Sequence, residues 1–244
     1  MKIYRRLKMK EHNKMQENTD ESYKGWTGSK RAVFVCNGAK GHAQEERAEY
    51  DYYASDPSAA TWLMEIEPQI TNIYEPCVGE GHLAKEFNKA GKLKAVSDLI
   101  DRGYYPEGIP TKYGLDFLKM DKVWKGDMAT NPPFASSLEW VKHSLDCITE
   151  GHYLALFMKI TFLEGKSRKA FFEKYPPIRV WVSSSRIPCA RNGEFEQPKK
   201  DKEGNVVLDE AGNPIMQRQS SAACYCWFIW QKGYKGPTEL KWFN

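Results

Sequence analysis

Apolar and polar positions follow two distinct patterns along the chain. Residues 135–151 place Leu138, Val141 and Leu145 at spacings of three and four, which predicts an amphipathic helix with one buried face. Residues 153–160 are instead almost continuously apolar, as is typical of a strand that is covered on both faces of a parallel sheet. The chain therefore combines helices and buried strands.

The same patterns predict an alternating order of elements. The predicted helices span residues 56–68, 82–91, 135–151 and 166–175. The predicted strands span residues 71–76, 94–100, 113–118, 127–131, 153–160, 178–185 and 222–232. Strands alternating with helices predict a doubly wound α/β sheet. Because no helix separates the last two strands, we expect the last strand to run antiparallel to its neighbour.

The ends and insertions of this pattern define the domain organisation. Residues 1–49 are polar and basic, which predicts an N-terminal arm that is partly disordered or docked. Residues 50–244 form the predicted domain. Within it, residues 189–220 are polar and contain two turn signals, which predicts a projecting loop or hairpin. This segment has two interpretations, a recognition element or a variable surface hairpin.

Composition narrows the class of protein. The chain has 244 residues, 41% of them apolar, and a net charge of +4, which permits a polyanionic partner without requiring one. Its six cysteines include no CxxC pair, and no histidine and cysteine spacing indicates a metal site. The chain shows neither a secretory signal nor an apolar run long enough to span a membrane. We expect a cytoplasmic protein with reduced thiols.

The first candidate site is a glycine-containing loop after the strand at 71–76. Glu75 ends this strand, and Gly79 and Gly81 allow a tight turn into the next helix, where the backbone can approach a ligand. Asp98 ends the following strand and lies where an acidic side chain accepts hydrogen bonds from ribose hydroxyls. The pattern indicates a nucleoside-bearing cofactor and does not separate NAD from S-adenosylmethionine. An ordinary tight turn and a helix-capping Asp are the structural alternatives.

Residues 114–118 end the next predicted strand and carry a second pair of candidates. Asp116 could accept a hydrogen bond from an adenine amino group, and Phe117 could lie on the adenine ring. The alternative is core packing beside a helix cap.

The most informative motif is Asn131-Pro132-Pro133-Phe134. Two prolines fix the backbone and remove two N–H donors, so the carbonyl oxygens of Asn131 and Pro132 are available as acceptors. The Asn131 side chain adds an acceptor and Phe134 adds an aromatic face. This set suits a planar substrate with an amino group, since the acceptors bind both N–H bonds and the nitrogen lone pair is freed toward an electrophile.

In this order, the motifs resemble those of the amino-methyltransferases with the Rossmann-like class I fold, and are most similar to small adenine-N6 DNA methyltransferases of phages and prophages. The resemblance covers roughly residues 50–235. It implies an α/β fold with a mostly parallel, seven-stranded sheet and an antiparallel last strand, S-adenosylmethionine as cofactor, and DNA, expected to be double-stranded, as partner. It also implies direct in-line methyl transfer to a flipped-out base. Related motifs serve methylation of RNA bases or of a protein glutamine amide.

The resemblance assigns roles to particular residues. It implies that the cofactor is bound by Tyr53, Asp56, Pro57, Glu75, Pro76, Gly79, Gly81, Asp98, Leu99, Asp116 and Phe117. It implies that catalysis rests on Asn131, Pro132, Pro133 and Phe134. Basic residues near strand ends, which are Lys159, Lys166, Arg168, Arg186 and Arg191, form a predicted phosphate-contacting rim. Their alternative is a solvated surface.

Parts of the sequence are also compatible with two other functions. A cytosine-C5 methyltransferase needs a cysteine nucleophile, often after proline, and the chain has Pro76-Cys77 and Pro188-Cys189. Cys77 lies inside the predicted cofactor loop, and Cys189 lacks supporting motifs. A non-catalytic nucleic-acid-binding protein with the same fold is the alternative from another class. The intact catalytic motif favours an enzyme.

Overall fold

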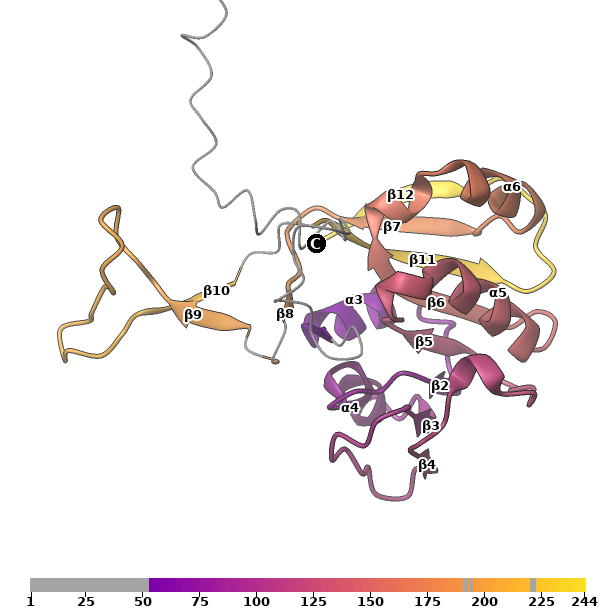
Figure 1. Ribbon diagram of the computed structural model, residues 1–244, viewed down its shortest axis with the longest axis horizontal. Coiled ribbons are helices and arrows are strands. Elements are labelled where there is room, and N and C mark those ends of the chain that lie inside the picture. The colour runs from indigo at the N-terminus through magenta and orange to yellow at the C-terminus, as the bar shows by residue number, and fades with distance from the viewer. Residues whose placement is uncertain (1–52, 191–192, 194, 220–222) are drawn as a thin grey trace, which may run out of the picture.

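An eight-stranded sheet runs through the centre of the computed structural model, which describes residues 53–190, 193, 195–219 and 223–244. The strand order is β12-β7-β11-β6-β5-β2-β3-β4, from top to bottom in Figure 1. These strands are β2 (Ile73–Glu75), β3 (Leu93–Ser97), β4 (Thr111–Lys112), β5 (Met128–Thr130), β6 (Tyr153–Lys159), β7 (Arg179–Ser183), β11 (Tyr225–Gln231) and β12 (Glu239–Phe243). The predicted N-terminal arm, residues 1–49, lies outside the described residues.

The sheet confirms the predicted α/β class and corrects its details. All neighbours pair in parallel except β11, which is antiparallel to both β6 and β7. The predicted strand at 222–232 is β11, and its antiparallel orientation toward β7 is confirmed, although β11 lies inside the sheet and β12 follows it in the chain. The last strand is β12, which adds to the edge beside β7 in parallel and brings the count from seven to eight. The segment that forms β12 was not among the predicted strands, which ended at residue 232.

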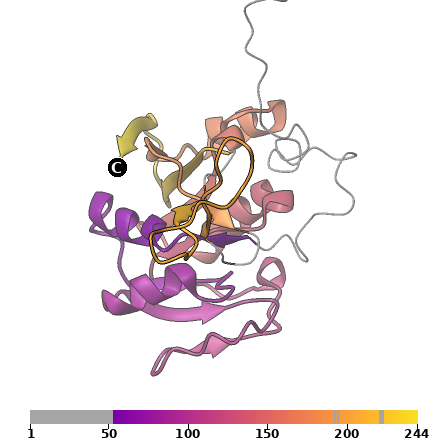
Figure 2. The ribbon, with the colours of Figure 1, turned by 90° about the vertical axis from the view of Figure 1, so that its left-hand side faces the viewer.

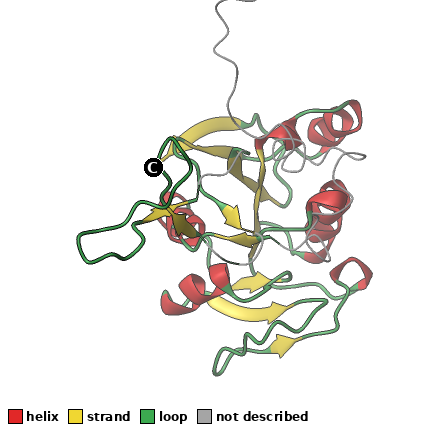
Figure 3. Cartoon of the chain, turned by 60° about the vertical axis from the view of Figure 1, so that its left-hand side comes forward, coloured by secondary structure: helices red, strands yellow, loops and turns green. Residues whose placement is uncertain are grey.

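Helices cover both faces of the sheet (Figure 3). The helices α3 (Ser58–Ile66) and α4 (His82–Lys89) pack into one apolar cluster, and α5 (Ser137–Cys147) and α6 (Lys166–Lys174) pack into the other. Two apolar clusters fill the layers between helices and sheet. Because both faces are covered, β6 and β11 are buried along nearly their whole length, as the apolar run at 153–160 predicted.

Three boundaries differ from the sequence prediction. The predicted strand at 113–118 is absent: β4 ends at Lys112, and Phe117–Lys119 form the 3-10 turn η2. The helix α5 ends at Cys147 and not at Gly151, because Ile148 is already extended and forms a parallel bridge with Trp124. The helix α3 begins at Ser58, where Asp56 still caps it by accepting the Ser58 N–H at 2.9 Å.

The predicted hairpin projects from the domain as an arm, which we define as residues 195–219 (Figure 1). Its stem is the antiparallel pair β9 (Glu196–Pro198) and β10 (Met216–Arg218). Beyond the stem the arm divides into two turns, residues 201–205 and 209–213, which spread to opposite sides in Figure 2. In each turn the leading aspartate accepts backbone N–H groups two and four residues ahead, so the two turns have the same internal bonding.

The remaining elements are short and lie near the carboxyl ends of the strands. They are β1 (Ala54–Ser55), β8 (Cys189–Ala190), η3 (Phe134–Ser136) and η4 (Ile160–Leu163). No helix in the described part of the chain is long and apolar enough to cross a membrane. The same residues hold no group of three or more His, Cys, Asp or Glu side chains that could bind a metal ion.

Candidate active site

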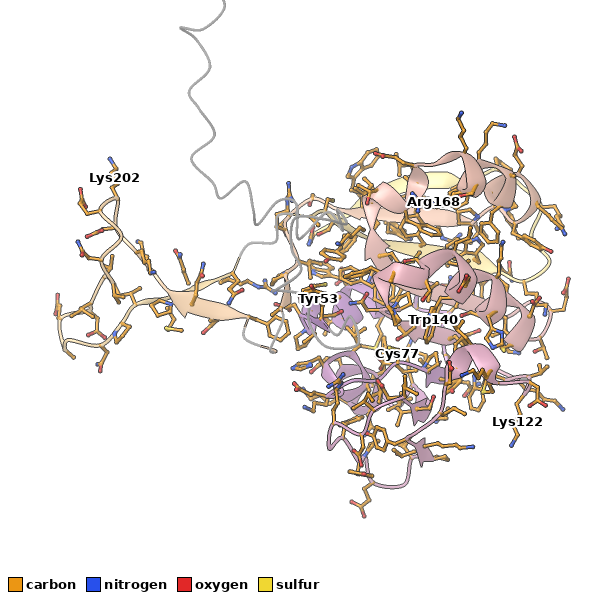
Figure 4. All side chains as sticks on the ribbon, viewed as in Figure 1. Tyr53, Cys77, Lys122, Trp140, Arg168 and Lys202 are labelled. Carbon is orange, nitrogen blue, oxygen red and sulfur yellow. The ribbon has the colours of Figure 1, made fainter. Side chains whose placement is uncertain are left out.

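A cavity of about 230 Å³ lies where β2, β3 and β5 end, at the carboxyl edge of the parallel strands. Open α/β sheets bind ligands at this edge. Figure 4 labels three lining residues, Tyr53, Cys77 and Trp140, which come together from distant parts of the sequence. The lining includes these predicted residues: Tyr53, Glu75, Pro76, Asp98, Leu99, Asp116, Phe117, Asn131, Pro132, Pro133 and Phe134.

The loop after β2 is shaped by its glycines. Gly79 and Gly81 have φ angles of 56° and 78°, which glycine adopts with little strain. A Cβ at Gly81 would overlap the ring of Tyr104. Neither glycine lines the cavity, so both act by setting the path of the backbone between Glu75 and α4.

Asp98 fastens this loop to the neighbouring strand. Its Oδ2 accepts the Gly79 N–H at 2.8 Å and its Oδ1 accepts the Ile100 N–H at 3.0 Å. The side chain is buried, with 6% of its surface exposed, and still lines the cavity. A carboxylate oxygen can accept more than one hydrogen bond, so Asp98 can hold the loop and accept from a ligand hydroxyl as well.

Glu75 is a buried acid with unused hydrogen-bonding capacity. Its exposed fraction is 2%, and its Oε2 has no hydrogen-bond partner among the described residues. Burial, together with the nearby Asp98, raises the pKa of Glu75 well above its usual range. A cavity wall with an unpaired carboxyl oxygen fits a ligand that brings a positive charge or a hydrogen-bond donor.

Asn131 follows β5 directly, and its side chain has a fixed orientation. The amide Nδ2 donates to Ser55 Oγ at 2.8 Å and to the Tyr53 carbonyl oxygen at 3.4 Å. Because a backbone carbonyl can only accept, this bonding assigns the NH₂ group to the β1 side. The other atom, Oδ1, is buried and has no partner among the described residues, although the residue lines the cavity. The amide therefore offers one buried acceptor at this position.

Phe134 is partly buried and lies among aromatic and cationic neighbours. Its ring stacks on Tyr53, with 5.8 Å between centroids and 27° between planes. Tyr225 lies 5.9 Å away, and Lys159 Nζ lies 4.5 Å from the Phe134 centroid. Tyr53 and Phe134 thus form an aromatic wall beside the Asn131 acceptor.

Asp116 and Phe117 line the cavity in a different setting from the predicted strand end. Asp116 Oδ1 accepts the Leu118 N–H at 3.2 Å, and Oδ2 pairs with Lys119 at 2.7 Å. The ring of Phe117 is 2% exposed and stacks on Trp140, with 4.6 Å between centroids. These are the contacts of the core-packing alternative. Leu99 also lines the cavity and is an exposed apolar side chain, with 48% of its surface accessible.

Several predicted residues lie away from the cavity. Asp56 and Pro57 do not line it. Arg168 donates to the carbonyl oxygens of Glu164 and Thr161, and its guanidinium lies 5.3 Å from the Phe162 ring, so it stabilises the turn before α6. Lys166 and Arg186 are exposed. Arg191 lies outside the described residues. Lys159 is the described member of the predicted rim that contacts the Asn131–Phe134 motif, through the Phe134 ring.

The two Pro-Cys pairs have the wrong electrostatics for a nucleophile. Burial raises the pKa of Cys189 to about 12 and raises that of Cys77 well above its usual range. A cysteine nucleophile needs a thiolate, which these surroundings disfavour. This disfavours the cytosine-C5 alternative.

Three residues that support the site were not predicted from the sequence, and one of them, Ser55, lines the cavity. Ser55 orients Asn131, Tyr104 packs over Gly81, and Arg218 pairs with Asp56. Tyr104 and Arg218 belong to no recognisable local motif, whereas Ser55 lies between Tyr53 and Pro57 and had no predicted role of its own. Their roles depend on contacts between segments far apart in the sequence.

Comparison with known proteins supports the fold. The structure of a candidate class I S-adenosylmethionine-dependent methyltransferase from Listeria monocytogenes matches with a TM-score of 0.53 at 10% identity, and the match covers 87% of this chain and 69% of that protein. A candidate RNA methyltransferase from Pyrococcus horikoshii has a TM-score of 0.49 at 12% identity over 84% of this chain and 98% of its own. The M protein of the type I restriction enzyme EcoKI has a TM-score of 0.45 at 13% identity over 76% and 45%. No protein-family model and no curated protein matches the sequence.

The chain therefore shares its fold with a class I S-adenosylmethionine-dependent methyltransferase. The described residues of the cavity are compatible with S-adenosylmethionine. Glu75 supplies a buried, unpaired acceptor for a cationic ligand, and Asp98 supplies a carboxylate where ribose hydroxyls would lie.

Proposed function

We propose that this protein is an S-adenosylmethionine-dependent methyltransferase that methylates N6 of adenine in DNA. The observation that carries the proposal is the orientation of Asn131. Its NH₂ group is bonded to Ser55 and Tyr53, which leaves Oδ1 as a buried acceptor in a wall of the cavity. A buried acceptor without a partner is costly unless a ligand supplies the donor. An exocyclic amino group supplies such a donor.

The chemistry follows from what each side chain can do. Asn131 Oδ1 accepts one amino hydrogen, and the carbonyl oxygen of Pro132, which also lines the cavity, is the expected acceptor for the second. The two acceptors hold the amino group so that its nitrogen lone pair is less delocalised into the ring and is directed toward the methyl group, and orientation and electrostatics provide most of the rate enhancement. Phe134 and Tyr53 provide aromatic surface for the base. The bound cofactor supplies the electrophilic methyl group.

DNA is the proposed polymer because the motif order is most similar to DNA adenine methyltransferases. An adenine amino group is paired inside a duplex, so the base must leave the stack before it reaches the cavity. Lys159, next to Phe134, places a positive charge beside the proposed base pocket. The acceptor set recognises an amino group and not a polymer, so RNA adenine and a glutamine amide are the outcomes that a test must separate.

The test is a transfer assay with labelled S-adenosylmethionine and four acceptors: unmethylated duplex DNA, single-stranded DNA, RNA and protein extract. Nucleic acids are digested to nucleosides and identified by mass spectrometry. N6-methyladenosine only in RNA, or label only in protein, would replace the proposed substrate and keep the chemistry. If cofactor binds but no acceptor is labelled, the non-catalytic alternative is favoured.

A further inference from the structure

The projecting arm is tied to the domain on the same side as the candidate active site. At the end of β10, Arg218 Nε and Nη2 both donate to Asp56 Oδ2, the former at 3.1 Å, and Nη2 also donates to Ser58 Oγ at 3.0 Å. Before β9, the Phe195 ring meets the edge of His82, with 5.3 Å between centroids. His82 begins α4 and lines the cavity. Both ends of the arm thus contact residues at or next to the site.

The ion pair is asymmetric in its burial. The Asp56 side chain is 8% exposed, whereas the Arg218 side chain is 53% exposed. Burial raises the pKa of Asp56, but hydrogen bonds from Arg218 and Ser58 outweigh this effect, so the net pKa is lowered and Asp56 is ionised. A buried carboxylate needs its partner more than an exposed guanidinium does, so loss of Arg218 should disturb the Asp56 side of the pair.

Asp56 is adjacent to the residue that orients Asn131. Ser55 accepts the Asn131 amide at 2.8 Å, and the Asp56 N–H donates to the Pro188 carbonyl oxygen at 3.1 Å. β1 also pairs with β8, so that Ser55 lies opposite Cys189. Arg218 is therefore linked to Asn131 in three steps: a hydrogen bond to Asp56, the peptide bond between Asp56 and Ser55, and the hydrogen bond from Asn131 to Ser55.

We propose that Arg218 is a positioning residue that couples the base of the arm to the Asn131 acceptor through Asp56 and Ser55. This inference rests on the proposed function for its substrate. The tip of the arm presents Lys202, at the far end of the molecule in Figure 4, with Asp201 and Glu203 on either side of it in the chain. The tip is therefore mixed in charge, and the proposal rests on the contacts at the base of the arm.

The coupling predicts a specific kinetic result. We expect Arg218→Ala to lower kcat for DNA by about tenfold, because a charge-assisted hydrogen bond is lost without removal of any group that touches the base. The cofactor Kd should stay within about twofold, because no lining residue changes. Arg218→Lys should recover part of the rate, since lysine can still pair with Asp56. Lys169→Ala, which breaks an exposed pair with Glu173 on α6, is the matched control and should change nothing.

A double-mutant cycle separates coupling from general destabilisation. We expect Asp56→Asn to resemble Arg218→Ala, and the double variant to be no slower than either single variant, because both remove the same link. Additive losses, or equal losses in kcat and cofactor affinity, would overturn the proposal.

Hydrogen exchange tests the link without relying on activity. In Arg218→Ala, amides of residues 54–60 should exchange faster than in the wild type, while those of α6 should not change. Unchanged exchange at 54–60 would overturn the coupling even if DNA is methylated. Faster exchange in a protein whose wild type methylates no DNA would support the link and refute the proposed substrate.

Discussion

Asn131 and Ser55 lie 76 positions apart in the sequence and are joined by a 2.8 Å hydrogen bond from Nδ2 to Oγ. This bond fixes the amide so that Oδ1 is the atom without a hydrogen-bond partner among the described residues. A free asparagine can present either its oxygen or its nitrogen, whereas an asparagine held in this way presents an acceptor. The catalytic motif is therefore incomplete without a residue from the segment before α3.

Ser55→Ala is expected to slow methyl transfer by roughly tenfold, the effect of losing one orienting hydrogen bond. The cofactor Kd should remain near the wild-type value, because Ser55 does not support the Gly79 loop. Single-turnover kinetics and calorimetry measure the two quantities separately. Ser55→Thr retains a hydroxyl and is the matched control. A normal rate in Ser55→Ala would show that Tyr53 alone orients the amide.

Cofactor binding is expected to release a proton from Glu75. Burial and Asp98 raise the pKa of Glu75 in the free protein, so it is protonated above the usual glutamate range. The positive charge of S-adenosylmethionine favours the carboxylate and lowers this pKa, so the proton leaves on binding. Calorimetry in two buffers of different ionisation enthalpy should show the proton release at pH values between the usual pKa of a glutamate and the raised pKa of Glu75. Glu75→Gln should abolish the buffer dependence, and a wild type without it would contradict this role.

The same raised pKa predicts how stability depends on pH. The folded state holds the Glu75 proton more tightly than the unfolded state, so the contribution of Glu75 to stability is largest below the unfolded pKa. It falls as the pH rises from the unfolded to the folded pKa. Urea unfolding of Glu75→Gln against wild type should therefore show the variant gaining relative stability as pH rises. A difference that is constant with pH would contradict the shift.

Gly81→Ala should be far more harmful than Gly91→Ala. Both glycines have positive φ, 78° and 70°, so each alanine carries a backbone cost of roughly 1 kcal/mol. At Gly81 the new Cβ also overlaps the Tyr104 ring, whereas nothing lies within 4 Å at Gly91. In Gly81→Ala, both the free energy of unfolding in urea and the cofactor affinity should fall. In Gly91→Ala, only the free energy of unfolding should fall, and only slightly. Equal effects would show that Tyr104 moves away without cost.

Asp98→Ala should weaken cofactor binding by at least about tenfold, because the Gly79 and Ile100 N–H groups lose their acceptor and the ribose loses its carboxylate. Asp101→Ala is the control. Asp101 is a nearby acid that bonds Gly103 and Tyr105 and does not line the cavity. An unchanged Kd in Asp98→Ala, measured by calorimetry, would exclude the ribose role.

The parts of the fold that depend on local pattern were predictable. The buried run at 153–160 gave β6, and Gly79 and Gly81 marked the turn into α4. The edge strand β12 was not predictable, because Leu240 and Trp242 are exposed and its pairing with β7 depends on the whole sheet. The predicted strand at 113–118 failed because Asp116 caps a 3-10 turn instead.

In the candidate site, too, local motifs were predictable from the sequence and contacts between distant segments were not. The Asn131-Pro132-Pro133-Phe134 motif indicates its chemistry from residue types alone. The partners of that motif and of Asp56 come from distant segments. The contacts of Ser55 with Asn131 and of Arg218 with Asp56 form only in the folded chain, so the sequence alone did not indicate them. The sequence suggested a ligand role for Asp56, whereas the structure places its carboxylate between Arg218 and the Ser58 N–H.

The most direct test of the central claim compares wild type with Asn131→Ala at saturating S-adenosylmethionine that carries a deuterated methyl group. Unmethylated duplex DNA is the acceptor, and deuterated N6-methyladenine per enzyme is measured by mass spectrometry after confirming equal cofactor occupancy. The account predicts product with the wild type and a loss of about 10²-fold or more with the variant, as expected when an acceptor for the reacting group is removed. Equal product from both proteins, or none from the wild type under these conditions, would contradict it.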